Sequence, residues 1–437
     1  MGKIEYWLSG RRPNLEHLIY YLIILFLPTQ LGRHFWPSFS YIYGIRVDYL
    51  SPTLYITDVL IILLFAFWLI NNTRNLSFEK LIGALADLLK TKSFLLLLPF
   101  LIIAGIVVSK NQMAGWYGII KLIEFGFIGY YTSVFINKKR FKKILIIFSI
   151  TLIFESLIAV FQFINQGSLG GLLYFLGERS FNGQTPGIAN ASLNGNLVLR
   201  PYATFSHPNV LSGFLLISMI LILYNLITKN KFLLRMFAFS LIVGSISLFL
   251  SMSRVAILLW LVIVTTFIFR TIGQKNKYGT LYLLIVLAIF FGIFFTPLGS
   301  RFLDLSFSDP VIKTRLDLIK NSVFLIIQNP IFGVGINNSI SELSLISMRD
   351  NIFYFQPVHN IFLLIALQVG LSGLLFFLWF IIRTYRNLRF TIYDLRFTIL
   401  SCILILGFFD HYFLTLQQGQ LLFSFALGLC WAKCYNI

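Results

Sequence analysis

The chain has 437 residues, of which 58% are hydrophobic and 12% charged, and 35 basic against 16 acidic residues give a net charge of +19. So few charged residues cannot cover the surface of a soluble chain of this length, which excludes a soluble globular protein and indicates a polytopic membrane protein. Nucleic acid is excluded as a partner because the basic residues punctuate apolar runs instead of gathering on one polar face. The cysteines, Cys402, Cys430 and Cys434, have neither a disulfide-framework nor a zinc-site spacing.

Twelve apolar runs are candidates for membrane-spanning helices, each of which needs about 20 residues. They predict an all-α polytopic membrane protein that forms a single integral membrane domain over residues 1–437. The first run follows Lys3, Arg11 and Arg12 as in a signal peptide, but no small-residue cleavage site follows, so we expect it to be retained. The runs lie near residues 16–31, 53–70, 93–109, 116–136, 144–164, 208–227, 236–252, 255–269, 280–297, 360–382, 397–414 and 419–433.

The basic residues predict the orientation, because cytoplasmic loops of membrane proteins are enriched in lysine and arginine. With a cytoplasmic N-terminus, 23 of the 35 basic residues fall inside, including the cluster from Lys138 to Lys143. This asymmetry and the even number of spans place both termini in the cytoplasm.

Two long loops are expected on the outer face. Long loops with polar residues of their own are usually functional or disordered, and we favour function here. Apolar stretches at 322–328 and 340–346 predict that the second loop contains helices lying on the membrane surface. The chain then divides into five spans over 16–164, a loop rich in Gly, Asn and Ser over 165–207, spans six to nine over 208–297, a long outer loop over 298–359, and three spans over 360–433.

Two arginines are candidates for binding phosphate. Arg254 follows Ser251-Met252-Ser253 with almost no loop between two apolar runs, so its guanidinium is expected at the outer membrane surface. It either snorkels to the interface or holds phosphate oxygens in a bidentate fork. Arg315 lies in the second long loop and either pairs with Asp317 on a helix surface or serves the same purpose. Gly333 and Gly335 further along most simply permit a turn.

Two segments carry histidines next to predicted spans. His359 closes the second loop and is either a helix cap or packing residue, or the best general base on the outer face. The segment 200–209 reads as a helix start at Ser206 and Pro208. Its Arg200 and His207 are candidate ligands for sugar or phosphate.

Further polar residues lie within predicted spans. Lys121 and Glu124 are three residues apart, which favours a structural pair on one helix face over a relay. Glu155 has no partner nearby in the sequence. Asp410 and His411 are adjacent, so on a helix their side chains point in different directions and adjacency alone is weak evidence of a site.

These features together resemble, in their order and predicted topology, the O-antigen ligase and polymerase family. The resemblance covers roughly residues 140–430, and the first four spans match in hydropathy alone. The segments that carry it are RPYATFSHPN at 200–209, SMSR at 251–254, Arg315 followed by NPIFGVG at 329–335, and His359-Asn360.

The resemblance implies a multi-span glycosyltransferase of the GT-C type in the bacterial cytoplasmic membrane. Such an enzyme moves a glycan from undecaprenyl pyrophosphate to an acceptor hydroxyl on the outer face, with inversion at the sugar carbon and without metal. It implies that Arg254 and Arg315 bind the pyrophosphate and that His359 is the base. The family leaves open whether the acceptor is lipid A core, a glycan repeat or protein.

The residues themselves also argue against a metal site, because no Asp-x-Asp pair occurs in the outer loops and Asp48, Asp304 and Asp309 are scattered. Two guanidiniums could take the place of a cation on the departing pyrophosphate, and no cofactor is expected. A competing hypothesis is a transporter or flippase for the same lipid-linked glycan. Transporters usually place their site near the midplane, whereas the candidate residues here gather at one face, which favours transfer.

Overall fold

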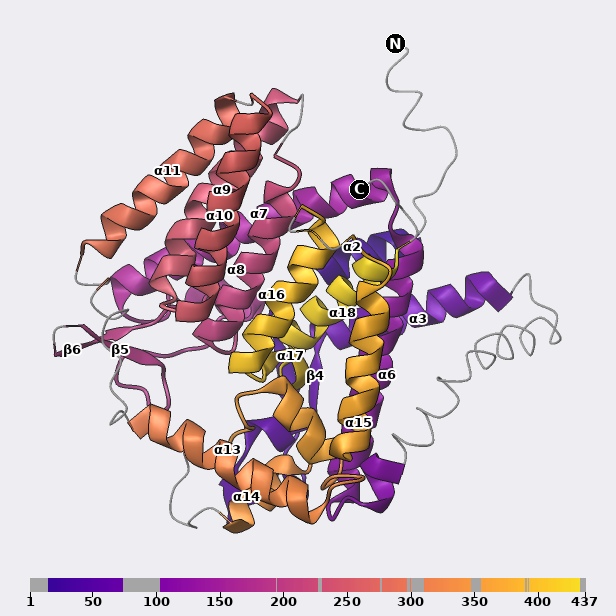
Figure 1. Ribbon diagram of the computed structural model, residues 1–437. Coiled ribbons are helices and arrows are strands. Elements are labelled where there is room, and N and C mark those ends of the chain that lie inside the picture. Colours follow the sequence, from indigo (N-terminus) through magenta and orange to yellow (C-terminus); the bar gives the residue numbers. More distant parts are fainter. Residues whose placement is uncertain are drawn as a thin grey trace.

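The computed structural model describes residues 15–73, 103–193, 195–226, 230–275, 277–296, 299, 310–346, 355–389, 391 and 393–432, and it is mostly helical (Figure 1). The predicted run at 93–109 lies largely outside these residues, as do Asp304 and Asp309. The described helices are α2 (Leu15–Leu25), α3 (Ile56–Thr73), α6 (Gln112–Phe135), α7 (Lys138–Asn165), α8 (Pro208–Leu223), α9 (Lys231–Leu250), α10 (Arg254–Gly273), α11 (Lys277–Phe294), α13 (Pro310–Gln328), α14 (Ser339–Ile346), α15 (Ile361–Tyr385), α16 (Leu395–Phe409), α17 (Tyr412–Thr415) and α18 (Gln417–Trp431).

Each of the other eleven predicted runs coincides with a helix of the structure. Among the described residues, five helices are long and apolar enough to cross a membrane: α6, α7, α9, α10 and α15. Shorter apolar helices account for five of the remaining six runs, including α8 and α16, and the last run coincides with α18. The all-α membrane class is therefore supported, whereas the number of twelve spans remains a prediction.

Helix α8 lies at the centre of the bundle, and nearly every one of its side chains is buried. A helix that is apolar on all sides must be covered on all sides. Helices α7, α9, α16 and α18 supply this cover (Figure 1). Because α8 begins at Pro208, the segment that precedes it, 200–207, is held against the interior of the bundle.

Short strands, which the all-α prediction did not include, lie between some of the helices. Between α2 and α3 the chain forms two antiparallel pairs, and a third pair forms a hairpin before α8. The strands are β1 (Gly32–His34) with β4 (Thr53–Tyr55), β2 (Tyr41–Ile42) with β3 (Ile45–Arg46), and β5 (Asn190–Leu193) with β6 (Asn196–Leu199).

Helices α13 and α14 confirm the prediction of helical segments within the second long loop. They lie together below the bundle in the view of Figure 1, next to the start of α15. Leu318 and Leu325 of α13 pack with Leu343 of α14 and Leu367 of α15. This apolar contact seats the loop on the helix that follows His359.

The turn between α13 and α14 is joined to a kink in α15. Gly333 and Gly370 both have positive φ, 68° and 75°, and a Cβ on either would clash with the backbone of the other segment. The Val334 and Gly335 amides donate to the carbonyls of Leu367 and Gln368, at 2.8 and 2.9 Å. The expected turn at Gly333 and Gly335 is thus confirmed, and its backbone is hydrogen-bonded to the backbone of α15.

A buried ion cluster centred on Lys121 links α3, α6 and α18. The Lys121 Nζ lies 2.8 Å from Asp58 Oδ2 and 3.0 Å from Glu124 Oε2, and it donates to Gln417 Oε1 at 3.2 Å. The Gln417 amide in turn donates to Thr57 and Asp58. The predicted Lys121–Glu124 pair is confirmed, and the structure adds a second carboxylate from a different helix.

Replacing Lys121 with methionine should strongly destabilise the protein, because two buried carboxylates would lose their cation. Removing one partner of a buried ion pair typically costs about 3–5 kcal/mol. Thermal unfolding in mild detergent checks this against Lys110→Met. Lys110 pairs with Glu342 at 2.7 Å but is 71% exposed, so its loss should cost about 1 kcal/mol or less. Equal losses in the two variants would contradict the prediction.

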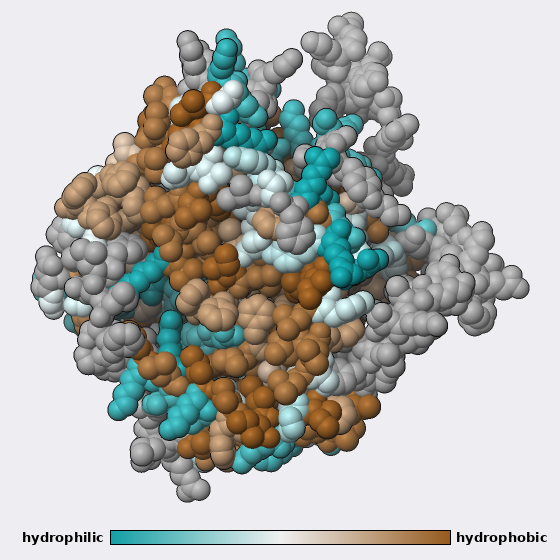
Figure 2. Space-filling model, in the orientation of Figure 1, coloured by the Kyte–Doolittle hydropathy of each residue, from teal (hydrophilic) through white to brown (hydrophobic). Residues whose placement is uncertain are grey.

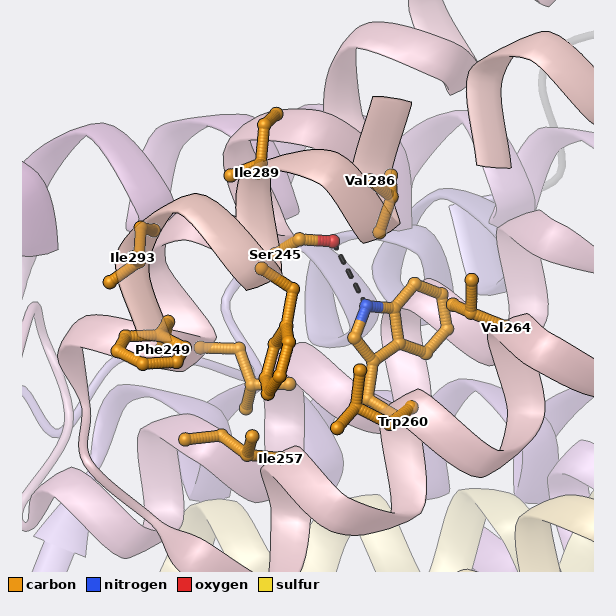
Figure 3. Close-up of a pocket in the computed structure, with 11 residues that line it drawn as sticks. Ser245, Phe249, Ile257, Trp260, Val264, Val286, Ile289 and Ile293 are labelled. Atoms are coloured by element: carbon orange, nitrogen blue, oxygen red, sulfur yellow. Dashed lines mark hydrogen bonds between the residues drawn. The ribbon is translucent and has the colours of Figure 1, made fainter. Parts of the chain in front are cut away.

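An apolar pocket lies between α9, α10 and α11 (Figure 3). It is lined by Phe249, Ile257, Trp260 and Val286, and the Trp260 indole N–H donates to the Ser245 hydroxyl at 2.9 Å. Its lining is almost entirely apolar, so it offers packing surface and no reactive group.

Candidate functional site

Three polar side chains converge where α15 begins and α16 ends. His359 stands two residues before α15, and Asp410 and His411 form the break between α16 and α17. One ligand atom from each residue lies within 4.8 Å of the others, and the two imidazole rings meet edge to face with centroids 4.9 Å apart. We call these three residues the central group.

The expectation that adjacent Asp410 and His411 diverge is wrong, because it assumed a continuous helix. Helix α16 ends at Phe409, Asp410 is extended with φ −154° and ψ 164°, and His411 returns to helical angles. This break turns both side chains toward His359. A hydrogen bond between His411 Nδ1 and Thr415 Oγ1, at 2.7 Å, fixes the orientation of the His411 ring.

A chain of hydrogen bonds braces Asp410 from the segment before α8. Asp410 accepts from the Asn209 side-chain amide at 2.7 Å and from its neighbour's backbone amide, His411 N, at 2.8 Å. Asn209 accepts from Arg200 Nη2 at 2.7 Å, and Arg200 Nε donates to the Ser251 carbonyl at 2.8 Å. Arg200 therefore connects the predicted segment 200–209 with the turn before Arg254, which favours a positioning role over direct substrate binding.

Arg315 on α13 reaches the same region from the second long loop. Its charge lowers the pKa of both His359 and His207, although burial is the larger cause in each. The Arg315 Nε is buried without a hydrogen-bond partner among the described residues. The alternative pairing with Asp317 does not occur among the ion pairs of those residues. Arg315 thus retains hydrogen-bonding capacity next to the central group.

His359 is not a helix cap. Asn360 caps α15, with its side-chain oxygen accepting from the Phe362 and Leu363 amides at 2.9 Å. The His359 ring keeps some exposed surface, but its Nδ1 is buried and has no hydrogen-bond partner in the described part of the chain. The cap alternative is therefore wrong, whereas the packing alternative is still compatible with the ring contact to His411. One nitrogen is left for a hydrogen bond to a substrate hydroxyl or to Asp410.

The surroundings keep His359 neutral. Burial lowers the pKa of its imidazole to about 3, an effect that the Asp410 carboxylate opposes and that His411, Arg315 and His207 reinforce. A neutral imidazole has a free lone pair at neutral pH, which is the form that a general base requires. The acid limb of a His359-dependent reaction therefore moves to lower pH than the ordinary histidine range.

His207 is the N-cap of α8, one residue after the Ser206 expected from the sequence. Its Nδ1 accepts from the Asn209 amide at 3.1 Å, and Pro208 occupies the first helical position. Burial, with help from Arg200, lowers the pKa of His207 to about 3. The predicted helix start is confirmed, and His207 Nδ1 has a structural role as the cap of α8.

Arg254 begins α10 directly after the turn that contains Ser251. Its side chain is half-buried, and the structure connects the turn to the central group through Arg200. Arg315, His207 and His359 thus lie close enough to act on one another electrostatically, while Arg254 is placed at the turn and not within the central group.

The segment between α2 and α3 forms a wall of the site that sequence reasoning missed. Tyr49 packs edge to face on His411, with centroids 5.5 Å apart. Ile42, Val47 and Leu50 pack against Ile340 and Phe355 of the second long loop. The alternation of apolar residues on either side of Gly44 was a weak sequence signal for the short strands of this segment.

Figure 2 shows hydrophilic residues around a hollow at the lower left of the view, near α13, and further hydrophilic residues along the top and right of the same face. Exposed Arg179 adds positive charge near the wall. It helps to lower the pKa of His34, for which burial is the main cause, and it opposes the burial that raises the pKa of Tyr49. The site therefore carries cations from both long loops.

Helix α7 holds the backbone of the segment before α8. Buried Glu155 accepts from the Thr204 backbone amide at 3.1 Å and from its hydroxyl at 2.9 Å. Two turns later, Gln162 accepts from the Tyr202 and Ala203 amides at 3.0 and 2.7 Å. These bonds explain Glu155, which had no partner nearby in the sequence, as an anchor for the residues between Arg200 and His207.

Replacing Glu155 with leucine should lower both stability and any activity of the site, because the buried Thr204 amide would lose its acceptor and the Thr204 hydroxyl would keep only the Pro28 carbonyl, at 3.2 Å. Each buried donor left unsatisfied costs about 1–3 kcal/mol. Glu155→Gln keeps one acceptor oxygen and should lose much less. Thermal unfolding of both variants tests the prediction, and similar losses in the two would contradict it.

The donor set of the central group fits a hydrogen-bonded histidine–carboxylate centre better than a metal site. Asp410 already accepts hydrogen bonds at both carboxylate oxygens, and His411 Nδ1 is engaged by Thr415. The Arg315 guanidinium acts on the same group and would oppose a bound dication.

Comparison with known families gives a match within this region. Residues 239–378 match the sequence model of the family described as O-antigen ligase, and this stretch contains Arg254, Arg315 and His359. This match supports an assignment to the O-antigen ligase family. No curated protein sequence matches the chain. The family supports an integral membrane enzyme of the ligase type that transfers glycan, with a lipid-linked glycan as donor and a glycan as acceptor in the membrane.

Proposed function

We propose that this O-antigen ligase family member moves a glycan from an undecaprenyl-pyrophosphate carrier to an acceptor hydroxyl on the outer face of the bacterial cytoplasmic membrane. The observation that carries the proposal is the meeting of neutral His359, buried Asp410 and Arg315 within the family-matched region and its neighbouring helix. A base, a carboxylate that orients it and a guanidinium together suit the attack of a hydroxyl on a phosphate-activated sugar.

In the proposed reaction, the acceptor oxygen forms a bond to the sugar carbon while the bond from that carbon to the carrier pyrophosphate breaks. His359 receives the hydroxyl proton, and the electron pair of the broken bond leaves with the pyrophosphate oxygen. The guanidinium groups of Arg315 and Arg254 stabilise the negative charge of the pyrophosphate through bidentate hydrogen bonds to its oxygens. Attack from the side opposite the leaving group inverts the sugar carbon, and no metal takes part.

Asp410 orients the His359–His411 pair and stabilises the imidazolium that forms. Asn209 and Arg200 hold Asp410, and Glu155 holds the segment that carries them. Both termini are proposed to be cytoplasmic, since the basic residues concentrate in the loops on that side. Ligase and polymerase acceptors are both compatible with this arrangement.

Purified protein in lipid vesicles, given a defined undecaprenyl-pyrophosphate-linked glycan and a set of lipid A core, glycan and protein acceptors, should form a new glycosidic bond. The product is identified by mass spectrometry and its anomeric configuration by NMR. A protein that translocates the donor across the vesicle membrane without forming such a bond would support the flippase alternative. The matched control is a His359→Ala protein that inserts normally.

A further inference from the structure

A short apolar projection follows α7 in the first long loop. It is a 3₁₀ helix, Gly171–Leu176, which we call the apolar finger. Leu172, Phe175 and Tyr174 are 82%, 67% and 57% exposed, whereas Leu173 packs inward against the helical core. Three large apolar side chains in one turn are therefore presented outward.

The finger is held in a defined conformation. Glycines with positive φ flank it, Gly170 at 74° and Gly177 at 106°. Buried Glu178 accepts from the Leu169 and Gly170 amides at 2.7 Å each, which closes the base of the finger. At its end, Thr29 after α2 donates to the Leu176 carbonyl at 2.7 Å. Such fixed exposure of apolar side chains requires a partner surface.

The position of the finger indicates which surface this is. Helix α7 has 28 residues and a length of about 42 Å, enough to cross the hydrocarbon core and reach into both headgroup regions. Basic residues Lys138 to Lys143 mark one end, and Asn165 ends the helix at the other. The finger begins six residues after Asn165 and is tied to the end of α2, so it stands at headgroup depth.

The finger also continues an exposed apolar stripe of α7. Exposed residues recur along this helix with alternating spacings of four and three, so they lie on one face. They are Ile150, Phe154, Leu157, Phe161 and Ile164. On a membrane-spanning helix, such a face contacts acyl chains. Exposed Leu169 continues the apolar surface from α7 toward the finger.

We propose that the apolar finger inserts into the outer part of the lipid leaflet at the Asn165 end of α7 and anchors the first long loop there. Leucine and phenylalanine at the tip bury apolar area at the boundary of headgroups and acyl chains, and tyrosine suits the same depth. The finger leads within three residues to Arg179, so lipid insertion sets the height of this cation near Tyr49. The proposal is independent of the chemistry proposed above.

The test is a depth measurement at single cysteines in protein whose Cys402, Cys430 and Cys434 are replaced by alanine. Leu172→Cys and Phe175→Cys are labelled with the environment-sensitive fluorophore NBD and reconstituted in phosphatidylethanolamine–phosphatidylglycerol vesicles. Gln184→Cys, exposed in the same loop, is the matched control. All variants should elute from gel filtration like their parent because the three positions are on the surface.

We expect blue-shifted emission and strong quenching by phospholipids with a shallow nitroxide at positions 172 and 175, and neither effect at 184. A membrane-impermeant thiol reagent should react with position 184 much faster than with 172. Aqueous emission at 172 and 175, or quenching equal to that at 184, would overturn the proposal. Because no donor or acceptor is present, failure here would leave glycan transfer untouched.

Discussion

His359→Ala should lower the turnover of glycan transfer by about 10²–10⁴, the usual contribution of a positioned general base, while binding of the lipid-linked donor is retained. The physical reason is that an unactivated hydroxyl is a poor nucleophile and that His359 offers a neutral nitrogen beside Arg315. Turnover is measured in single-turnover experiments with a defined donor, and donor binding separately by co-elution of labelled donor with the purified protein in detergent.

His411→Gln is the informative comparison, because His411 shares the central group but is buried, 3% exposed, and bonded to Thr415. It should lose less turnover than His359→Ala. If His411→Gln were the more damaged variant and His359→Ala kept its turnover, the base would be assigned wrongly.

The pH dependence sharpens this expectation. The active form of the base is the neutral one, and burial lowers the pKa of His359 to about 3 in the free protein. The ratio kcat/KM, which reports the free enzyme, should therefore stay level from pH 8 to about 5 as far as His359 is concerned. Bound pyrophosphate raises the pKa of a nearby imidazole, so the acid limb of kcat should lie at higher pH than that of kcat/KM. An acid limb of kcat/KM in the ordinary histidine range that disappears in His359→Ala would contradict the burial argument.

The second large effect is expected at the two arginines. Arg315→Lys and Arg254→Lys keep the charge but lose the planar fork, and loss of one preorganised donor typically costs about 10²–10³ in turnover. Turnover and membrane insertion are measured together, with Arg386→Lys as control because Arg386 is exposed after α15 at the far end from His359. Near-normal turnover of Arg254→Lys alone would assign Arg254 to snorkelling, and near-normal turnover of both would remove the pyrophosphate clamp.

The sequence was sufficient for features that depend on local pattern. Apolar runs marked the helices, and the apolar stretches of the second long loop marked α13 and α14. Arg315 and His359 could be selected because they stand at polar positions beside spans. Features that depend on tertiary contact could not be predicted. Asp410 and His411 converge on His359 only because α16 ends at Phe409. No proline marks this end, and the nearby Gly407 lies inside α16, where it packs against Ile361.

The same limit applies to the two supports of the site. Glu155 finds its partner Thr204 49 residues away, and Tyr49 reaches His411 from a segment that appeared to be a plain connection. Helical periodicity contains no information about such distant pairs. Charge patterning likewise identified Lys121 with Glu124 but not Asp58, which arrives from another helix.

The backbone bonds between the turn at Gly333 and the kink at Gly370 have a mechanical consequence. They couple α13, which carries Arg315, to α15, which follows His359, so that the two residues move as one rigid unit. The second long loop cannot swing away from the membrane to admit a bulky acceptor without breaking this junction. In the proposed reaction, a long glycan would then reach the site from the side of the segment between α2 and α3, whose 3₁₀ helix Asp48–Leu50 carries Tyr49.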